Sequence, residues 1–337
     1  MLSPRVTNNT GIPLALAVWL LHDEYDYHNK ENYFSLTTLL KPLRQIVLPR
    51  RKINKLVAPP DVADFVARAL GHSLHDSIEK AWKVGYKRSL ALLGTPEDVI
   101  EAVRINPTDE ERRADPGMLP VFLEQRAYRE VTVNGVTYTI GGKFDMVMEG
   151  LLNDNKSTSV YAYIFGGRDN DYILQMSGYD WIDKAQPMPR ITEDHGVINF
   201  IFTDWQKSQA RSNANYPSSR VGEKRLPLLG EAEMDLWVKR KLTLIQKYMD
   251  APETQLPECS DEELWRSEPK FKYYSDPVKA KTPGARSTKN FTTLAEANQH
   301  LSSAGKGTVV TEPGEPKRCG YCDAFDRCTQ KDRYFPT

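Results

Sequence analysis

Apolar residues recur with helical or strand spacing along most of this chain of 337 residues. Between residues 61 and 93 the apolar positions keep helical spacing, which predicts a long helix. The stretch 129–140 alternates apolar and polar side chains on either side of Asn134-Gly135, a pair typical of a two-residue hairpin turn. Residues 195–202 form an apolar run that predicts a buried strand, and 230–249 carries an apolar helical stripe.

Loops and chain breaks separate these elements. Pro59-Pro60 interrupts the chain after a basic stretch at 41–55. Residues 94–118 are rich in Pro, Asp, Glu and Arg and predict a loop with one or two helical turns, and 206–225 predicts an irregular basic loop. Residues 160–165 either complete the strand that precedes them or begin the loop that follows.

The order of elements predicts three sections. Residues 1–60 form an N-terminal helical and basic segment, and 61–250 forms a core that mixes strands and helices in an α/β arrangement. After a linker, 259–337 contains a small α/β insertion and a group of cysteines. A chain of this length can bury one sizeable core and carry an appendage of this kind.

The net charge of the whole chain favours no class of partner, because 45 basic residues balance 45 acidic ones. The distribution is uneven, since 41–55 contains no acidic residue and 207–225 contains one, Glu223. Such stretches either neutralise phosphates or form solvated surface. The candidate nucleic-acid-binding residues in them are Arg50, Arg51, Lys52, Lys207 and Arg211.

The sequence gives no indication of a membrane partner. No apolar run reaches membrane-spanning length, and no secretory signal is present. The most apolar short run, Val18-Trp19-Leu20-Leu21, is followed at once by polar residues. We therefore expect a cytoplasmic protein.

The strongest chemical signal is Asp145, followed nine residues later by Asp154-Asn155-Lys156. Side chains at i and i+2 of a strand share a face, so Asp154 and Lys156 would project together. A hairpin over residues 136–160 would bring Asp145 beside them. Two carboxylates and an ammonium on one face suit a divalent cation and a water held for attack on phosphate. The same spacing also fits a surface hairpin with an ion pair.

Two predicted helices carry further polar pairs at helical spacing. His75 and Glu79 lie at i and i+4 upstream of these residues, and Gln175 and Tyr179 have the same spacing downstream. Plainer interpretations exist: His75 as a core histidine, Glu79 as a surface residue, and Gln175 with Tyr179 as helix packing. Glu124, at the start of the predicted sheet, could be an additional acid near the metal.

This order of motifs resembles the PD-(D/E)XK nuclease superfamily in its RecB-like branch. The matching features are a histidine helix, an Asp, an Asp-x-Lys and a Gln-x3-Tyr helix, and they span about residues 71–205. Phe144 precedes Asp145 where the family's name has a proline, which is a frequent departure. The resemblance implies a restriction-endonuclease-like fold with a mixed central sheet flanked by helices.

The resemblance also implies an active site that uses Mg²⁺ or Mn²⁺. The implied metal ligands are His75, Asp145, Asp154 and the backbone carbonyl of Asn155. Lys156 would orient or deprotonate the attacking water and stabilise charge on the phosphate. Gln175 and Tyr179 would bind the scissile strand or orient this lysine.

The implied activity is that of a hydrolase, a deoxyribonuclease that acts as an exonuclease on DNA ends in recombination or repair. Because no G-x4-G-K-[ST] motif is present, the chain resembles stand-alone enzymes of the phage type. DNA is then the substrate, a single-strand annealing protein is a candidate recombination partner, and the compartment is a bacterial or phage-infected cytoplasm. The alternative is a nucleic-acid-binding module with a structural metal–thiolate cluster and incidental or no cleavage.

The C-terminal cysteines form a second signal. Cys319, Cys322 and Cys328 have C-x2-C-x5-C spacing, and the remaining cysteine is Cys259. Thiols clustered this tightly favour a metal over a disulfide framework, and four thiolates suit zinc or an iron–sulfur cluster. Free thiols are the third interpretation.

The cysteine spacing resembles the cluster-bearing branch of the same superfamily, such as CRISPR adaptation nucleases, and so implies a 4Fe–4S cluster, with zinc as the alternative. In those relatives the lone cysteine precedes the nuclease motifs, whereas Cys259 follows them here. If Cys259 is not the fourth ligand, a non-cysteine residue such as His300 has to be considered.

Overall fold

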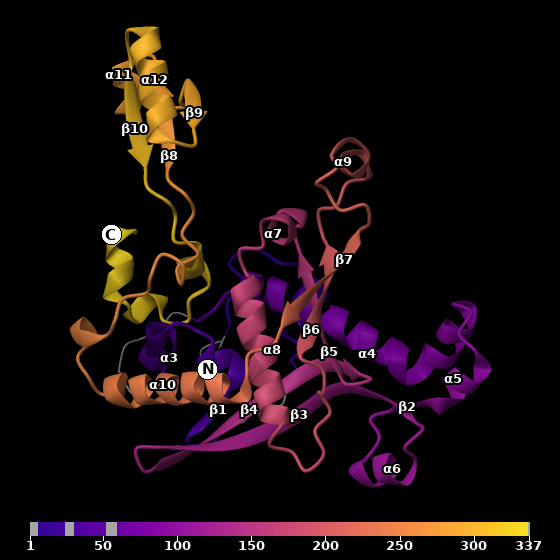
Figure 1. Ribbon diagram of the computed structural model, residues 1–337. Coiled ribbons are helices and arrows are strands. Elements are labelled where there is room, and N and C mark those ends of the chain that lie inside the picture. Colours follow the sequence, from indigo (N-terminus) through magenta and orange to yellow (C-terminus); the bar gives the residue numbers. More distant parts are fainter. Residues whose placement is uncertain (1–5, 24–29, 52–58, 336–337) are drawn as a thin grey trace. The chain divides into compact units, whose positions relative to one another are not determined.

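The computed structural model describes residues 6–23, 30–51 and 59–335 (Figure 1). The chain forms two compact units. Unit 1 contains Met1–Leu40 and Leu56–Thr243, and unit 2 contains Lys41–Lys55 and Leu244–Thr337. The sections expected from the sequence divide the chain differently, because the N-terminal segment splits between the two units.

Unit 1 is a mixed sheet with helices packed against it. Its strands are β1 (Tyr33–Ser35), β2 (Val103–Ile105), β3 (Leu119–Val133), β4 (Val136–Met148), β5 (Leu151–Thr158), β6 (His195–Phe202) and β7 (Val221–Pro227). Its helices are α1 (Leu14–Leu21), α2 (Leu36–Leu39), α4 (Val66–Leu92), α5 (Glu97–Ala102), α6 (Asp109–Ala114), α7 (Val160–Phe165), α8 (Asp169–Asp183) and α9 (Lys207–Ser212), with the 3-10 turn η1 (Val62–Phe65). Helix α10 (Glu231–Met249) runs from unit 1 into unit 2.

The sheet has seven strands in the order β2-β3-β4-β5-β6-β7, and β1 pairs with β4 beside this path. The β2–β3, β5–β6 and β1–β4 pairs are parallel, and the β3–β4, β4–β5 and β6–β7 pairs are antiparallel. The fold class predicted from the sequence, a mixed central sheet flanked by helices as in restriction endonucleases, is therefore confirmed.

Strand β4 is paired differently along its two edges. One edge pairs with β3 over almost its whole length. The other edge pairs with β1 at Thr139–Gly141 and with β5 at Met146–Met148. Residues 142–145 lie between these two ladders. On this edge, residues 142–145 can therefore be contacted by groups other than a paired strand.

Both turns of this meander follow from the sequence. Asn134 and Gly135 adopt φ values of 50° and 79°, and Glu149 and Gly150 adopt 51° and 83°. Two successive positive φ angles are typical of a type I′ turn, whose twist matches that of the two strands. The hairpin predicted at Asn134-Gly135 is confirmed.

Unit 2 contains a three-stranded sheet and a set of short 3-10 turns. Its strands, in the order β10-β8-β9, are β8 (Lys270–Tyr274), β9 (Lys289–Phe291) and β10 (Thr308–Glu312). Its helices are α3 (Leu43–Arg50), α11 (Pro277–Ala280) and α12 (Leu294–Ala304), with turns η2 (Glu253–Gln255), η3 (Lys317–Tyr321), η4 (Phe325–Arg327) and η5 (Thr329–Arg333). The small α/β element predicted within 259–337 is present.

Three local predictions differ from the structure. Residues 160–165 are helix α7, because Ser159 follows the end of β5 and its side chain accepts a hydrogen bond from the N–H of Ala162 as an N-cap. The segment 206–225 is not wholly irregular, since it contains α9 and most of β7. Within 94–118, residues 103–105 form β2, which pairs with β3.

Among the described helices, none combines the length and the apolar character that a bilayer span requires.

Helix α8 approaches the sheet closely where β4 has a glycine. A Cβ built on Gly142 would lie 2.9 Å from Cδ1 of both Ile182 and Tyr179. Gly142→Ala should therefore lower the free energy of unfolding by about 1–3 kcal/mol through overpacking.

Gly85→Ala is the matched control, because no atom lies within 4 Å of the Cβ it would add in helix α4. This substitution should stabilise the protein by about 0.5–1 kcal/mol through helix propensity. Denaturant unfolding measures both variants. Equal effects of the two substitutions would contradict the close packing of α8 on β4.

Candidate functional site

Helix α4 directs His75 toward strands β3 and β4. Its apolar side chains pack on a cluster of buried residues from β2, β3 and β4; the helix contributes Ile78, Trp82, Tyr86 and Leu90, and the strands contribute Val103, Val121, Leu123 and Met146. His75 lies one turn before Ile78, so it belongs to the same side of the helix. The packing of α4 on the sheet therefore fixes the position of the imidazole.

Glu124 lies opposite Asp145 on the neighbouring strand. The β3–β4 register pairs Leu123 with Met146 and Gln125 with Phe144, which places Glu124 across from Asp145. Glu124 has a φ of +52°, a left-handed conformation that is uncommon outside glycine and costs about 1–3 kcal/mol.

The side chain of Asn106 supports the backbone beside this position. Its Nδ2 donates to the carbonyl of Leu123 at 3.3 Å, and the N–H of Leu123 donates to its Oδ1 at 2.6 Å. These two bonds hold the strand where Glu124 departs from regular β geometry.

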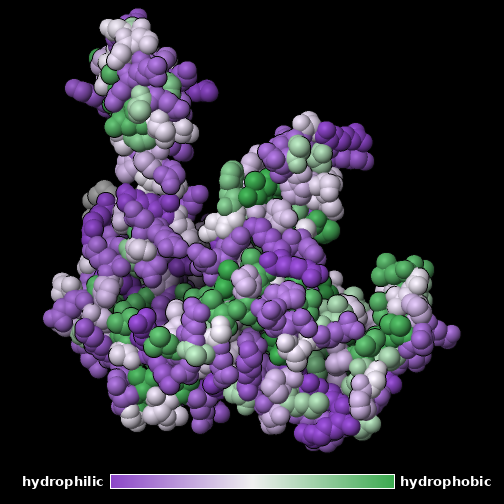
Figure 2. Space-filling view, in the orientation of Figure 1, coloured by the Kyte–Doolittle hydropathy of each residue, from purple (hydrophilic) through white to green (hydrophobic). Residues whose placement is uncertain are grey.

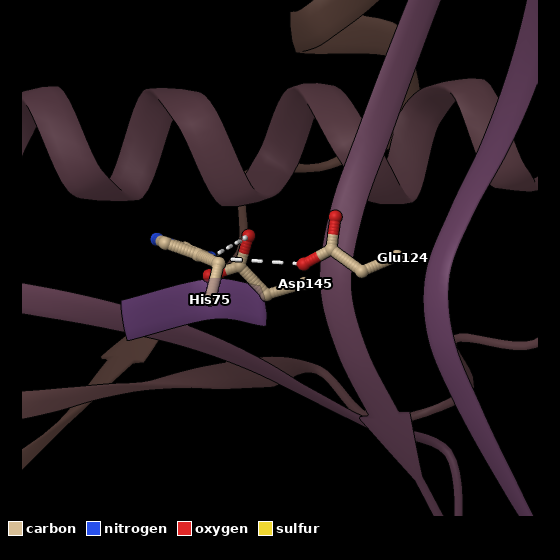
Figure 3. A group of neighbouring side chains, drawn as sticks. All are labelled: His75, Glu124 and Asp145. Atoms are coloured by element: carbon tan, nitrogen blue, oxygen red, sulfur yellow. Dashed lines mark ion pairs between the residues drawn. The ribbon is translucent and has the colours of Figure 1, made fainter. Parts of the chain in front are cut away.

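His75, Glu124 and Asp145 converge on one point (Figure 3). The Nδ1 atom of His75 lies 3.3 Å from Oδ1 of Asp145 and 3.7 Å from Oε1 of Glu124. One potential ligand atom from each residue lies within 4.8 Å of the other two. The second oxygen of Glu124 forms an ion pair with Lys143 at 2.6 Å.

The two carboxylates determine the protonation of His75. Its hydrogen bond with Asp145, followed by that with Glu124, raises the pKa of His75 to about 10, although partial burial opposes this rise. Burial would raise the pKa of Asp145, but His75, Lys156 and the backbone N–H of Asn155 together lower it. Without a metal, His75 is therefore protonated at neutral pH. Its imidazolium then carries the positive charge between the two carboxylates.

Asp154 and Lys156 project together from β5, as the strand spacing predicts. Nζ of Lys156 lies 2.5 Å from Oδ2 of Asp154, so the ammonium pairs with a buried carboxylate oxygen. Burial raises the pKa of Asp154 to about 6, although Lys156 opposes the shift. Burial lowers the pKa of Lys156, but Asp154 and Asp145 outweigh it, so the lysine pKa is raised. Lys156 is therefore an ammonium at neutral pH.

The backbone of β5 is tied to Asp145 where the β4–β5 ladder has ended. The N–H of Asn155 donates to Oδ2 of Asp145 at 2.8 Å. The Asn155 side chain accepts a hydrogen bond from Asn199 of β6 at 3.3 Å. Asp145 thus connects the His75 and Glu124 side of the site to the Asp154-x-Lys156 strand.

Gln175 and Tyr179 reach the same site from helix α8. Nε2 of Gln175 lies 3.5 Å from Oδ1 of Asp154 and donates to the hydroxyl of Tyr179 at 3.1 Å. Tyr179 is 5 % exposed and packs over Gly142. The structure therefore brings together Asp145, Asp154, Asn155, Lys156, His75, Gln175 and Tyr179, all predicted from the sequence.

The donor set fits a hard divalent cation. Carboxylate oxygens are the preferred ligands of Mg²⁺ and Mn²⁺, and one imidazole nitrogen is compatible with Mn²⁺. His75, Glu124 and Asp145 would hold the ion, and Asp154, whose Oδ2 pairs with Lys156, is a further carboxylate nearby. Glu79 is not a member of this donor group, and its carboxylate forms an ion pair with Lys83 at 2.6 Å.

Glu124, which the sequence suggests as an additional acid near the metal, lies in this group. The signal was present in the hairpin register: Val133 pairs with Val136 across the Asn134-Gly135 turn, and counting back from this pair places Glu124 opposite Asp145. A second group, Glu193, Asp194 and His195, has similar spacing, but both of its acids are exposed, whereas Glu124 and Asp145 are half-buried.

The predicted basic residues fall in different places. Arg51 donates to the carbonyls of Met249 and Tyr248, so its guanidinium binds the end of helix α10. Arg50 bonds the carbonyl of Ile46 in its own helix. Lys207 and Arg211 are exposed on α9. Lys52 lies outside the described residues.

The four cysteines line one cavity of about 30 Å³ in unit 2. Cys259 exchanges two backbone hydrogen bonds with the side chain of Gln330, each 2.9 Å long, which holds it beside the C-terminal tail. Arg44 is buried, donates to Sγ of Cys328 at 3.3 Å and pairs with Glu253.

The protonation of the cysteine thiols and the distances between their sulfurs bear on whether they hold zinc or an iron–sulfur cluster. Burial raises the pKa of Cys259 to about 12, so without a metal this thiol is neutral. Within the described ranges, no three cysteine sulfurs lie within 4.8 Å of one another. Four sulfurs around one zinc would be about 3.8 Å apart, given Zn–S bonds of about 2.3 Å. His300 does not line this cavity and packs against the rings of Tyr273 and Phe291.

No family model and no curated protein matches the chain. Among solved structures, SSO0001 is similar with 16 % identity and a TM-score of 0.42, over 68 % of this chain and 84 % of that one. A phage-related exonuclease from Haemophilus somnus 129PT is similar with 14 % identity and a TM-score of 0.24, over 64 % of this chain and 95 % of that one. Both TM-scores are below 0.5, so the assignments above rest on the topology and the site geometry.

The geometry predicts a role for Glu124 in metal binding. Glu124→Gln should weaken Mn²⁺ binding by at least about tenfold, because even residues that only orient a metal ligand are worth about 10–100-fold in affinity. Titration calorimetry with Mn²⁺ measures the change. Glu193→Gln, in the exposed acidic group, is the matched control and should bind Mn²⁺ as the unmodified chain does. Equal affinities for all three proteins would remove Glu124 from the site.

Proposed function

We propose that this protein is a metal-dependent DNA nuclease, a hydrolase of phosphodiester bonds. The observation that carries the proposal is the convergence of His75, Glu124 and Asp145 beside Asp154 and Lys156. A bound Mg²⁺ or Mn²⁺ would supply charge neutralisation at the phosphate and a more acidic water. The chain's own residues determine the position of each reacting group.

The residues have distinct tasks in this proposal. His75, Glu124, Asp145 and Asp154 hold the cation. The Lys156 ammonium, which faces Asp154, orients the attacking water or stabilises the negative charge that develops on the phosphate. Gln175 donates toward both Asp154 and Tyr179, so it can fix the carboxylate or bind the scissile strand.

The finer parts of the proposal come from the resemblance to RecB-like nucleases. They are exonuclease action on DNA ends, a role in recombination or repair, and a single-strand annealing protein as partner. Digestion of end-labelled linear DNA and covalently closed circular DNA with Mn²⁺ tests the first of these. Loss of linear DNA with survival of the circles is expected, and rapid nicking of the circles would contradict it.

Substitutions at the site test the chemistry. Asp154→Ala should abolish metal-dependent cleavage. Lys156→Met should reduce the rate by about 10²–10³-fold, the scale for removing one group that stabilises transition-state charge, and should still bind Mn²⁺. Asp194→Asn, outside the site, should cleave normally.

Single-turnover cleavage with Mg²⁺ and Mn²⁺ measures these rates, and far-ultraviolet circular dichroism checks the fold of each variant. Full activity of Asp154→Ala would refute the nuclease proposal. DNA binding without cleavage by the unmodified chain would favour the alternative, a binding module.

We also propose that Cys259, Cys319, Cys322 and Cys328 bind one 4Fe–4S cluster with a structural role. Support comes from the four thiols, which line one cavity, and from the preference of thiolates for such clusters. Binding free energy at such a site becomes folding free energy, because it joins Cys259 to the C-terminal tail.

Cys322→Ala should then remove the iron and lower the thermal stability, whereas Asp154→Ala should retain the iron. Elemental analysis and the visible absorption spectrum of anaerobically purified protein measure the metal. Stoichiometric zinc without iron would contradict the cluster and leave the metal clamp intact. Unchanged iron and stability in Cys259→Ser would exclude Cys259 as a ligand.

A further inference from the structure

Helix α7 exposes two aromatic rings immediately after the strand that carries Asp154 and Lys156. Tyr161 is 60 % exposed and Phe165 is 76 % exposed. Their ring centroids are 6.2 Å apart and their planes differ by 15°, so the rings stack on each other. Figure 2 shows hydrophobic surface over α7. The pair therefore presents aromatic surface to solvent.

The opposite side of α7 is firmly attached to the sheet. Val160 is fully buried, and its N–H donates to Oδ1 of Asp204 at 2.8 Å. The ring of Tyr163 packs edge-on against Phe200 and Phe202, with centroids 5.2 and 5.1 Å away. These contacts leave Tyr161 and Phe165 on the outer side. The exposed pair is therefore held in place before any ligand arrives.

The pair lies within a few nucleotides of the metal site. Tyr161 follows Lys156 by five residues, so their Cα atoms are at most about 18 Å apart. Stacked nucleotides of one strand advance about 3.4 Å each, so five of them span a similar distance. A DNA strand with a phosphate beside Lys156 can thus reach α7 with its neighbouring bases.

The segment after β6 supplies exposed basic side chains. The segment after β6 starts beside α7, because the N–H of Thr203 bonds the carbonyl of Thr158 at 2.9 Å. Residues 205–222 contain no acid. Lys207 and Arg211 are exposed and have no ion pair among the residues that the structure describes. Arg220 is exposed and lies over the ring of Trp205 at 5.9 Å.

We propose that α7 and residues 203–220 form a single-strand-binding lobe, in which Tyr161 and Phe165 stack on unpaired bases and Lys207, Arg211 and Arg220 bind phosphates. Aromatic platforms beside basic residues are the usual means of binding single strands without sequence preference. The excess of positive charge favours a polyanion over an apolar protein partner. The assignment rests on the proposed nuclease function, because that function places a strand beside Lys156.

Binding of a fluorescent oligothymidylate in EDTA tests the lobe without cleavage. Tyr161→Ala and Phe165→Ala should each weaken binding by about tenfold or more, since stacking one base is worth ~1–3 kcal/mol. Phe165→Trp should bind as the unmodified chain does, and Phe165→Leu should bind as poorly as Phe165→Ala because it has no aromatic face. Leu92→Ala, an exposed apolar residue of α4, is the control and should have no effect.

The charged residues give an independent measurement. Lys207→Ala and Arg211→Ala should each reduce the slope of log affinity against log salt by about 0.7, the value for one phosphate contact on a single strand. Unchanged affinity in both ring variants, or full binding by Phe165→Leu, would overturn the proposal. If the ring variants lost self-association but bound DNA normally, the proposal would also be overturned, because the rings would then belong to an interface between copies of this chain.

This assay separates the lobe from the nuclease proposal. If the unmodified chain cleaves DNA with Mn²⁺ but the ring variants bind normally, the lobe is wrong and the nuclease proposal stands. If the rings and basic residues control binding but no cleavage occurs with Mn²⁺ or Mg²⁺, the lobe stands and the nuclease proposal is wrong.

Discussion

Two carboxylates held opposite each other on adjacent strands require a positive charge between them. Glu124 and Asp145 occupy such positions, and like charges directly across a ladder destabilise a sheet. Lys143 neutralises one side of Glu124, and His75 supplies the charge between the acids. A divalent cation at this point would serve the same purpose with a larger charge. The arrangement is therefore costly as a purely structural feature and reasonable as a metal site.

The rest of unit 1 keeps this costly arrangement in place. Along the edge that faces away from β3, strand β4 has no ladder partner between its β1 and β5 segments, so Asp145 can bond the backbone of Asn155 instead. Gly142 lets α8 approach closely enough for Gln175, which also bonds Tyr179, to reach Asp154. Asn106 holds the irregular backbone at Leu123. The open edge of β4, the glycine at 142 and the Asn106 side chain each position a polar group that packing of the apolar core alone would not position.

Much of the fold and site follows from local sequence signals. The Asn134-Gly135 turn, the alternating strands and the apolar stripe of α4 specify the hairpin and the helix that carry Asp145 and His75. The spacing of Asp154 and Lys156 correctly predicts that they share a face. These signals depend on periodicity and turn chemistry, which a sequence contains directly.

Other features depend on tertiary contacts and could not be predicted in this way. Residues 160–165 are apolar enough for a strand, but the cap at Ser159 and the bond to Asp204 make them a helix. Arg51 lies in a basic run typical of a phosphate-binding surface, yet its guanidinium binds carbonyls of α10. The positive φ of Glu124 has no sequence signature, because left-handed glutamate is stabilised only by its surroundings.

The most direct test is anomalous diffraction from crystals grown with Mn²⁺. The account predicts a manganese peak enclosed by Nδ1 of His75 and carboxylate oxygens of Glu124 and Asp145, near Asp154. Distances of about 2.0–2.2 Å to these atoms would be expected for a small divalent ion. The absence of a peak at this position, or a peak only at Glu193, Asp194 and His195, would contradict the central claim.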